Sequence, residues 1–130
     1  MAQARENDLQ RAILDALAAK GYWAMRVNSG THAIAATAEH ARRVIRSAPK
    51  GTPDILVIKP YGWLEVKLLG GSLRESQVAW HTRAEREGLR CMVVRSIADA
   101  LRWVDRWARD DAVRGKLRRC PVGRCPLEEP

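Results

Sequence analysis

The chain has no phenylalanine, only three cysteines and no long uninterrupted apolar segment. Three is an odd and low number of cysteines for a scaffold held by disulfides, which favours a reducing compartment. No apolar stretch approaches the roughly 20 residues that a membrane-spanning helix needs. The first ten residues, MAQARENDLQ, also lack the hydrophobic segment of a secretory signal. We therefore expect a cytoplasmic protein with no membrane partner.

Acidic residues are scarce relative to basic ones. The chain has 23 Lys and Arg against 15 Asp and Glu, a formal net charge of +8 and a pI near 10.1. This excess favours a polyanionic partner, of which nucleic acid is the commonest. An Arg-rich composition without such a partner is the alternative. The 130 residues, 46% of them hydrophobic, suffice for one domain with a modest core.

Hydrophobic periodicity predicts an α/β domain whose mixed sheet carries helices on both faces. Segment 29–48 has no clear pattern, so a loop, a short helix and a strand near 42–46 all remain open. Periodicity also ends near residue 108, which predicts a folded domain over 1–108 and a basic, flexible tail over 109–130. The expected elements are a helix over 5–20, strands over 22–28, 54–58, 63–68 and 89–94, and helices over 72–87 and 96–108.

Local signals refine three of these elements. In the first strand, Trp23 and Met25 share an apolar face that would be buried. Ser72 and Glu75 have the spacing of a capping box at the start of the second helix. Ser96 gives an N-cap signal of the same kind for the last helix.

The most informative segment is KGTPDILVIKPYGWLEVKLLGG, residues 50–71. Pro60 and Gly62 separate two apolar runs, so these runs most simply form an antiparallel hairpin. Asp54 would then lie opposite or diagonal to Glu65 and Lys67, roughly 5–8 Å away. Because side chains alternate along a strand, Glu65 and Lys67 would share one face.

Two carboxylates and an ammonium group held together in this way suit a divalent metal that cleaves phosphodiesters. One Mg²⁺ could bridge Asp54 and Glu65 and keep several waters. A metal-bound water would be the nucleophile, and the ion would neutralise charge on the phosphate. Lys67 would orient or deprotonate that water and stabilise the transition state. The alternative is a solvated Glu-x-Lys pair. The charge of Asp54, at the start of an apolar strand covered on both faces, would however be costly without a counter-ion or a function.

Pro53-Asp54 followed by Glu65-Val66-Lys67 resembles the PD-(D/E)XK nuclease motif. Over about residues 5–98 the chain resembles, more specifically, the VRR-NUC (virus-type replication-repair nuclease) family. Segment 29–48 matches that pattern poorly, and the tail after about residue 110 has no counterpart in it. The matching residues are Glu6, Arg26-Val27-Asn28, Gly51-Thr52-Pro53-Asp54, Glu65-Val66-Lys67 and Gln77, in that order.

The resemblance implies a restriction-endonuclease-like three-layer fold with a central mixed sheet flanked by helices. It also implies Mg²⁺- or Mn²⁺-dependent hydrolysis of DNA by a structure-selective endonuclease, such as a Holliday-junction or flap nuclease in replication or repair. Stand-alone members, often phage-borne, act as homodimers on branched or structured DNA. Two alternatives stay open: a non-catalytic nucleic-acid-binding module of the same fold, and a restriction-type endonuclease.

The resemblance also adds two residues to the catalytic centre. Glu6 would be an outer metal ligand reached from the first helix, with Asp8 as the fallback. A solvated acid favoured by the helix dipole is the alternative interpretation of Glu6. Gln77 would hydrogen-bond Lys67 or a metal-bound water, unless it simply lies on the surface.

Three further residues are candidates for contact with DNA. Arg26 and Asn28 share a polar strand face that would meet a phosphate, and Lys50 would touch the backbone near the scissile phosphate. An exposed strand face and a solvated lysine are the alternatives. The histidines, at 32, 40 and 81, have no paired Ser, Cys or Asp spacing and are weak candidates for catalysis.

Overall fold

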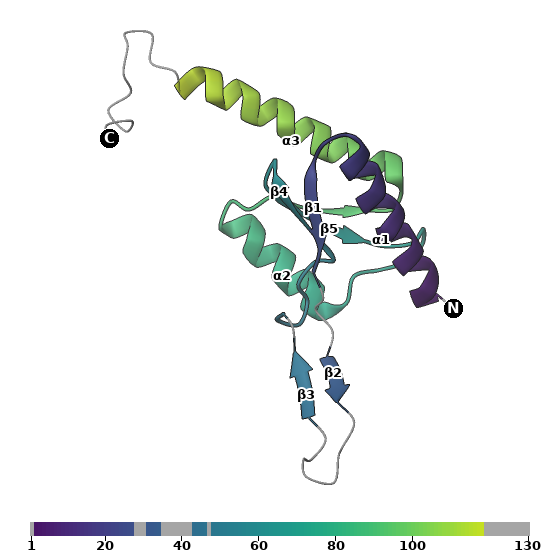
Figure 1. Ribbon diagram of the computed structural model, residues 1–130. Helices are drawn as coiled ribbons and strands as arrows, with labels where there is room; N and C mark the ends of the chain where they lie inside the picture. Colours follow the sequence, from purple (N-terminus) through teal and green to yellow (C-terminus); the bar gives the residue numbers. More distant parts are fainter. Residues whose placement is uncertain (1, 28–30, 35–42, 47, 119–130) are drawn as a thin grey trace.

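The computed structural model describes residues 2–27, 31–34, 43–46 and 48–118 (Figure 1). Both helices and strands contribute to the described part, so the chain is α/β, as the periodicity predicts. The helices are α1 (Ala2–Ala19), α2 (Glu75–Arg86) and α3 (Ile97–Arg118). The strands are β1 (Trp23–Arg26), β2 (Thr31–Ile34), β3 (Arg43–Arg46), β4 (Ile55–Lys59), β5 (Gly62–Val66) and β6 (Cys91–Val94).

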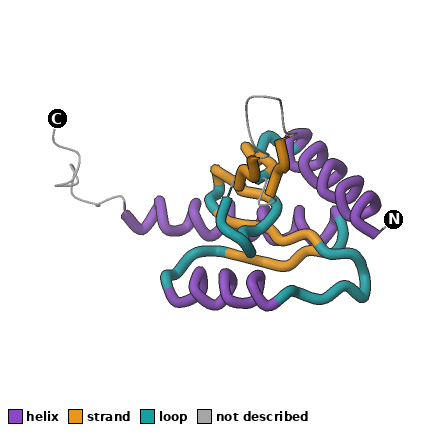
Figure 2. Tube along the Cα trace, turned by 90° about the horizontal axis from the view of Figure 1, so that it is seen from below, coloured by secondary structure: helices purple, strands orange, loops and turns teal. Residues whose placement is uncertain are grey.

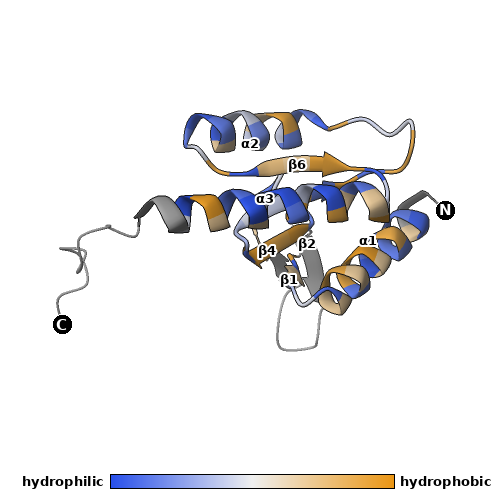
Figure 3. Ribbon diagram, turned by 90° about the horizontal axis from the view of Figure 1, so that it is seen from above, coloured by the Kyte–Doolittle hydropathy of each residue, from blue (hydrophilic) through white to orange (hydrophobic). Residues whose placement is uncertain are grey.

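Four of the strands form a mixed sheet in the order β1-β4-β5-β6. Strand β4 is antiparallel to β1 and β5, whereas β6 is parallel to β5. The predicted hairpin is confirmed, since Ile55 pairs with Leu64 and Val57 with Gly62. Helices α1 and α3 lie on one side of this sheet and α2 lies on the other (Figures 2 and 3).

The main core lies between the sheet and the α1–α3 side. Its fully buried side chains include Ile13 and Leu17 from α1 and Val104 from α3. On the other side, Leu56 and Ile58 of β4 are only half-buried, and α2 buries Ala84 alone among its residues. The side of the sheet that faces α2 is therefore less completely buried than the side that faces α1 and α3.

Strands β2 and β3 form a separate antiparallel pair, which we call the β2–β3 ribbon. Thr31 pairs with Arg46 and Ile34 with Arg43. The ribbon is inserted between β1 and β4 and projects from the rest of the molecule (Figure 1). The strand near 42–46 that the sequence left open is therefore present.

The expected burial of β1 is wrong. Trp23 and Met25 are 63% and 43% exposed, whereas Tyr22 and Ala24 pack against the core. Apolar residues stand on both faces of this edge strand, so alternation alone cannot tell which face is buried. Helix α1 packs on β1, and the face of Ala24 points into the core. A bulge between Trp23 and Ala24 shifts the register.

Two helix boundaries also differ from expectation. Helix α2 begins at Glu75 with Arg74 as N-cap, and the backbone N–H of Arg74 donates to Gln77 Oε1 at 2.8 Å. The capping box at Ser72 is therefore wrong by two residues. Helix α3 does not end near 108 but continues to Arg118. A two-point contact from Arg90 to Asp111, at 2.6 and 3.1 Å, fastens this extension to the body.

The remaining boundary signal is confirmed at the start of α3, where the Asp99 N–H donates to Ser96 Oγ at 3.0 Å. Residues 119–130, with Cys120 and Cys125, lie outside the described residues. Within the described ranges, no helix combines the length and apolar character required to cross a bilayer.

Candidate functional site

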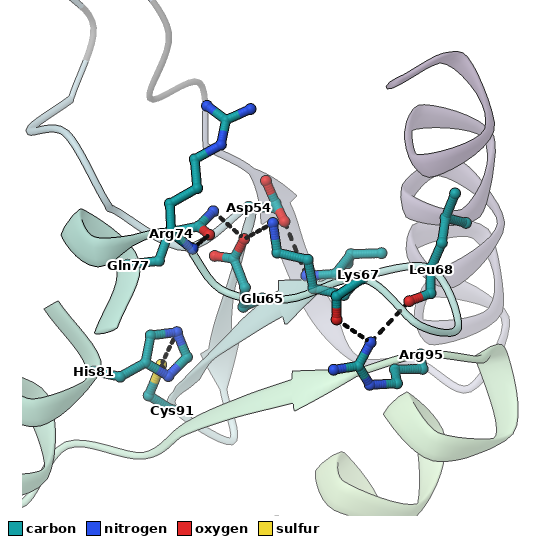
Figure 4. A network of polar contacts seen from close by, with 11 residues as sticks. Asp54, Glu65, Lys67, Leu68, Arg74, Gln77, His81, Cys91 and Arg95 are labelled. Atoms are coloured by element: carbon teal, nitrogen blue, oxygen red, sulfur yellow. Dashed lines mark hydrogen bonds and ion pairs between the residues drawn. The ribbon is translucent and has the colours of Figure 1, made fainter. Parts of the chain in front are cut away.

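The β4–β5 hairpin brings Asp54 against the end of β5, as the sequence predicts (Figure 4). The backbone N–H of Val66 donates to Asp54 Oδ2 at 2.8 Å. The carbonyl oxygen of Asp54 accepts a hydrogen bond from the Val27 N–H at 2.7 Å. Asp54, which directly precedes β4, is thus held by hydrogen bonds from the chain at the ends of both β1 and β5.

Glu65 is the most deeply buried charged residue of the hairpin, at 1% exposure. Its Oε1 accepts a hydrogen bond from Gln77 Nε2 at 2.8 Å and lies 3.8 Å from Lys67 Nζ. Its Oε2 is buried and has no hydrogen-bond donor in the described part of the chain. One oxygen of this carboxyl group therefore has a hydrogen-bond donor, and the other has none among the described residues.

Burial places two acidic groups where neither is well solvated. Burial, together with the negative charge of Asp54, raises the pKa of Glu65 to about 8. The pKa of Asp54 is also raised by burial, although the Val66 N–H hydrogen bond and the charge of Lys67 oppose that shift. A proton or a cation must compensate this pair for both carboxylates to be tolerated.

Lys67 lies just beyond β5 and is 7% exposed. Its backbone N–H donates to the Val94 carbonyl at 3.0 Å, which continues the pairing with β6 past the strand end. The side chain therefore stays on the side of the sheet that carries Glu65 (Figure 4). There its positive charge lowers the pKa of both Asp54 and Glu65.

Arg95 is a positioning residue that the sequence reasoning missed. Its Nη1 donates to the carbonyl oxygens of Leu68 and Gly71, at 2.8 and 2.7 Å, and so fixes the loop that follows Lys67 (Figure 4). The contact depends on the parallel pairing of β5 with β6, which no local pattern reveals.

Gly51 fixes the approach of the chain to Asp54. Its φ of +91° is in the left-handed region, and an added Cβ would lie 2.2 Å from the Ser76 carbonyl oxygen. The loop before Asp54 therefore rests directly on the first turn of α2, the same turn that carries Gln77. This close contact fixes the position of the loop that leads to Asp54 relative to the turn of α2 that carries Gln77.

Helix α1 brings Glu6 toward the site without joining it. Glu6 continues the helical stripe of Ile13 and Leu17, and its charge makes a minor contribution to the raised pKa of Glu65. The fallback residue Asp8 is exposed. Gln10, on the same stripe, was missed; it is 3% exposed and its Oε1 has no partner among the described residues.

The candidate DNA-binding residues lie around the site at greater distances. Arg26 donates to Asn7 Oδ1 at 3.1 Å, and its charge has a small lowering effect on the pKa of Asp54. Lys50 is exposed beside Gly51. Asn28 lies outside the described residues, so the polar face that it would share with Arg26 toward a phosphate stays a prediction.

His81 lies against a cysteine. Its Nδ1 is 3.3 Å from Cys91 Sγ, and burial lowers the histidine pKa. Burial also raises the pKa of Cys91 to about 12, which suppresses the thiolate that a cysteine nucleophile needs. Of the other histidines, residue 40 and the side chain of residue 32 lie outside the described part.

The donor set at the centre fits a hard divalent cation. In the ranges that the structure describes, no three Asp, Glu, His or Cys side chains form a ready-made ligand cluster. The pair Asp54 and Glu65 nevertheless offers oxygen ligands, and the open Glu65 Oε2 needs a partner. Mg²⁺ and Mn²⁺ accept such a set because they bind through one or two carboxylates and keep waters.

Searches against protein-family models, curated proteins and solved structures found no match to this chain. The functional inference therefore depends on the residues and their geometry.

Proposed function

We propose that this protein is a metal-dependent endonuclease that hydrolyses phosphodiester bonds in branched or otherwise structured DNA. The observation that supports this most is the buried pair Asp54 and Glu65 beside Lys67, with Glu65 Oε2 left without a donor. The Val66 N–H, the Gln77 amide and the Lys67 charge compensate the two acids in part, and a bound cation would compensate them further. The basic charge of the whole chain supports a polyanionic substrate.

The residues divide the work of such a reaction. Asp54 and Glu65 would hold Mg²⁺ or Mn²⁺, with Glu6 reaching it through a water. When bound, the ion would supply an activated water and neutralise charge on the phosphate. Gln77 keeps the Glu65 carboxylate in one orientation through the 2.8 Å hydrogen bond. Lys67 would orient the attacking water and stabilise the oxygens that gain charge.

The fold and motif order support the same proposal. A four-stranded mixed sheet with helices on both sides is compatible with the restriction-endonuclease-like three-layer fold. The ordered resemblance to the VRR-NUC family supports a homodimer in which each subunit nicks one strand. Arg26, Asn28 and Lys50 would contact the DNA backbone around the site.

A cleavage assay tests the proposal directly. Purified protein is incubated with Mg²⁺ or Mn²⁺ and end-labelled four-way junctions, flaps and linear duplexes. We expect nicks near the branch point that disappear with a chelator. Binding without cleavage under either metal would instead indicate a non-catalytic module. Discrete fragments from long linear duplex DNA would indicate a restriction-type enzyme.

A further inference from the structure

The β2–β3 ribbon starts and ends at the candidate site. The chain leaves β1 at Arg26, and the N–H of the next residue, Val27, donates a hydrogen bond to the Asp54 carbonyl at 2.7 Å. It returns through Lys50 and Gly51, which rests on the first turn of α2. Both ends of the insertion therefore flank Asp54, so an object bound by the ribbon would be held next to the acidic pair.

The ribbon lacks a packing partner within the described part of the molecule. Its strands make their extensive contacts with each other and not with the four-stranded sheet or a helix, and they project away from the body (Figure 1). An isolated two-stranded hairpin is at best marginally stable in water. A surface of this kind gains stability when a partner covers it.

The charge of the insertion indicates what that partner is. Its sequence contains Arg42, Arg43 and Arg46 against a single acid, Glu39. Positions 43 and 46 fall on opposite faces of the ribbon because side chains alternate along a strand. Their paired positions, Ile34 and Thr31, are uncharged. Basic positions on both faces suit an element that lies between two phosphate backbones better than one that rests flat on a single surface.

We propose that the β2–β3 ribbon binds double-stranded DNA by entering the major groove of the duplex next to the scissile phosphate. The major groove, about 12 Å wide, admits a two-stranded ribbon. This inference rests on the proposed nuclease function for the orientation of the DNA. It adds that the protein recognises a duplex segment flanking the cut, and that Arg43 and Arg46 provide phosphate contacts.

The experiment compares the double variant Arg43→Ala/Arg46→Ala with the wild type. Binding to a labelled duplex and to a single strand of equal length is measured over a range of salt concentrations, with a chelator present to prevent cleavage. We expect the variant to bind duplex at least about tenfold more weakly. The slope of log affinity against log salt should become shallower by about 2, one for each lost phosphate contact. Single-strand binding should change much less.

A matched control removes the same charge elsewhere. Arg102 and Arg109 are exposed on α3, which lies on the side of the molecule away from the ribbon (Figure 1). Arg102→Ala/Arg109→Ala should leave the salt slope for duplex close to wild type. Equal losses in the two double variants would overturn the proposal, because net charge alone would then explain binding.

A second variant tests the ribbon as a whole, in case groups other than Arg43 and Arg46 also contribute to duplex binding. Replacing residues 29–47 by a short Gly/Ser turn removes the ribbon, and thermal unfolding checks that the body remains folded. Unchanged duplex binding by the folded variant would overturn the proposal. A loss of dimers in sedimentation without a change in duplex binding would also overturn it, because the ribbon would then bind a second copy of the chain.

Hydrolysis of bis(p-nitrophenyl) phosphate with Mn²⁺ separates this inference from the proposed function. If the wild type fails to hydrolyse both this small diester and DNA, the nuclease proposal fails. The chelator-based binding series still decides the ribbon proposal in that case, because it requires no catalysis.

Discussion

Gln77 donates from Nε2 to Glu65 Oε1 at 2.8 Å and accepts at its own Oε1 from the Arg74 N–H at 2.8 Å. One side chain therefore caps the start of α2 and orients the buried carboxylate. The register of the helix and the direction of a candidate metal ligand are linked through this residue. A disturbance at the helix start would thus reach the site without touching Glu65 directly.

Gln77→Ala should weaken Mn²⁺ binding by about 10–100-fold, the usual cost of losing a group that orients a metal ligand. Isothermal calorimetry measures this affinity. Thr82→Ala, which removes another polar side chain from the same helix, is the control and should bind Mn²⁺ as the wild type does. Equal affinities in Gln77→Ala and the wild type would contradict a role for Gln77 in orienting Glu65.

The raised pKa of Glu65 predicts how stability depends on pH. Its folded value of about 8 exceeds the ordinary value of 4.5, so the folded state binds this proton more tightly than the unfolded state. The stabilisation is fully present below about pH 4.5 and is lost as pH rises toward 8. In metal-free protein, the free energy of unfolding should fall over this window by about 4–5 kcal/mol from this residue.

Urea unfolding at several pH values, with a chelator present, measures that fall. The variant Glu65→Gln cannot titrate, so the difference between wild type and variant isolates the contribution of Glu65. Mg²⁺ should raise the wild-type unfolding temperature more at pH 8 than at pH 5.5, because it competes with the proton. If the difference in unfolding free energy between wild type and variant stays flat or rises with pH, burial does not raise the pKa of Glu65.

Lys67→Ala should lower DNA cleavage by at least about 100-fold, the range expected for losing a positioned proton donor or electrostatic stabiliser. Lys67→Arg keeps the charge but not the compact ammonium group, and it should rescue cleavage only in part. Single-turnover cleavage with saturating protein measures the step, and binding in a chelator shows that DNA affinity stays close to wild type. Unchanged turnover in Lys67→Ala would remove this residue from the mechanism.

Gly51→Ala should destabilise the protein by about 2–4 kcal/mol. The new Cβ would meet the Ser76 carbonyl at 2.2 Å in addition to the strain of φ +91°. Gly70→Ala is a matched control, since Gly70 has φ +83° with nothing within 4 Å of the added Cβ. It should cost only about 1 kcal/mol. Chemical denaturation measures both, and similar losses would mean that contact with Ser76 is unimportant.

The sequence predicted the centre of the site because that centre is local. Asp54 and Glu65 belong to one hairpin, and the turn residues Pro60 and Gly62 were enough to pair its strands. The period of two then placed Lys67 beside Glu65. Long-range relationships were less accessible. The parallel pairing of β5 with β6, and with it the contact of Arg95 on the Leu68–Gly71 loop, leaves no periodic signal.

Burial and helix length were the weaker predictions. The buried face of β1 depends on which side α1 and α3 occupy, and apolar residues such as Trp23 and Ala24 stand on both. The extension of α3 is polar, so it shows no apolar stripe, yet Asp111 is held by Arg90 from the strand layer. A contact between two charged side chains distant in sequence cannot be read from spacing.

The position of the ribbon also bears on how such a protein can diversify. Its two ends lie beside Asp54, while the described strands β2 and β3 make their extensive contacts with each other. Lengthening a connection costs little closure entropy, about 0.6 kcal/mol for each doubling of a flexible loop. The reach of this insertion can therefore change while the hairpin that carries the acids keeps its geometry.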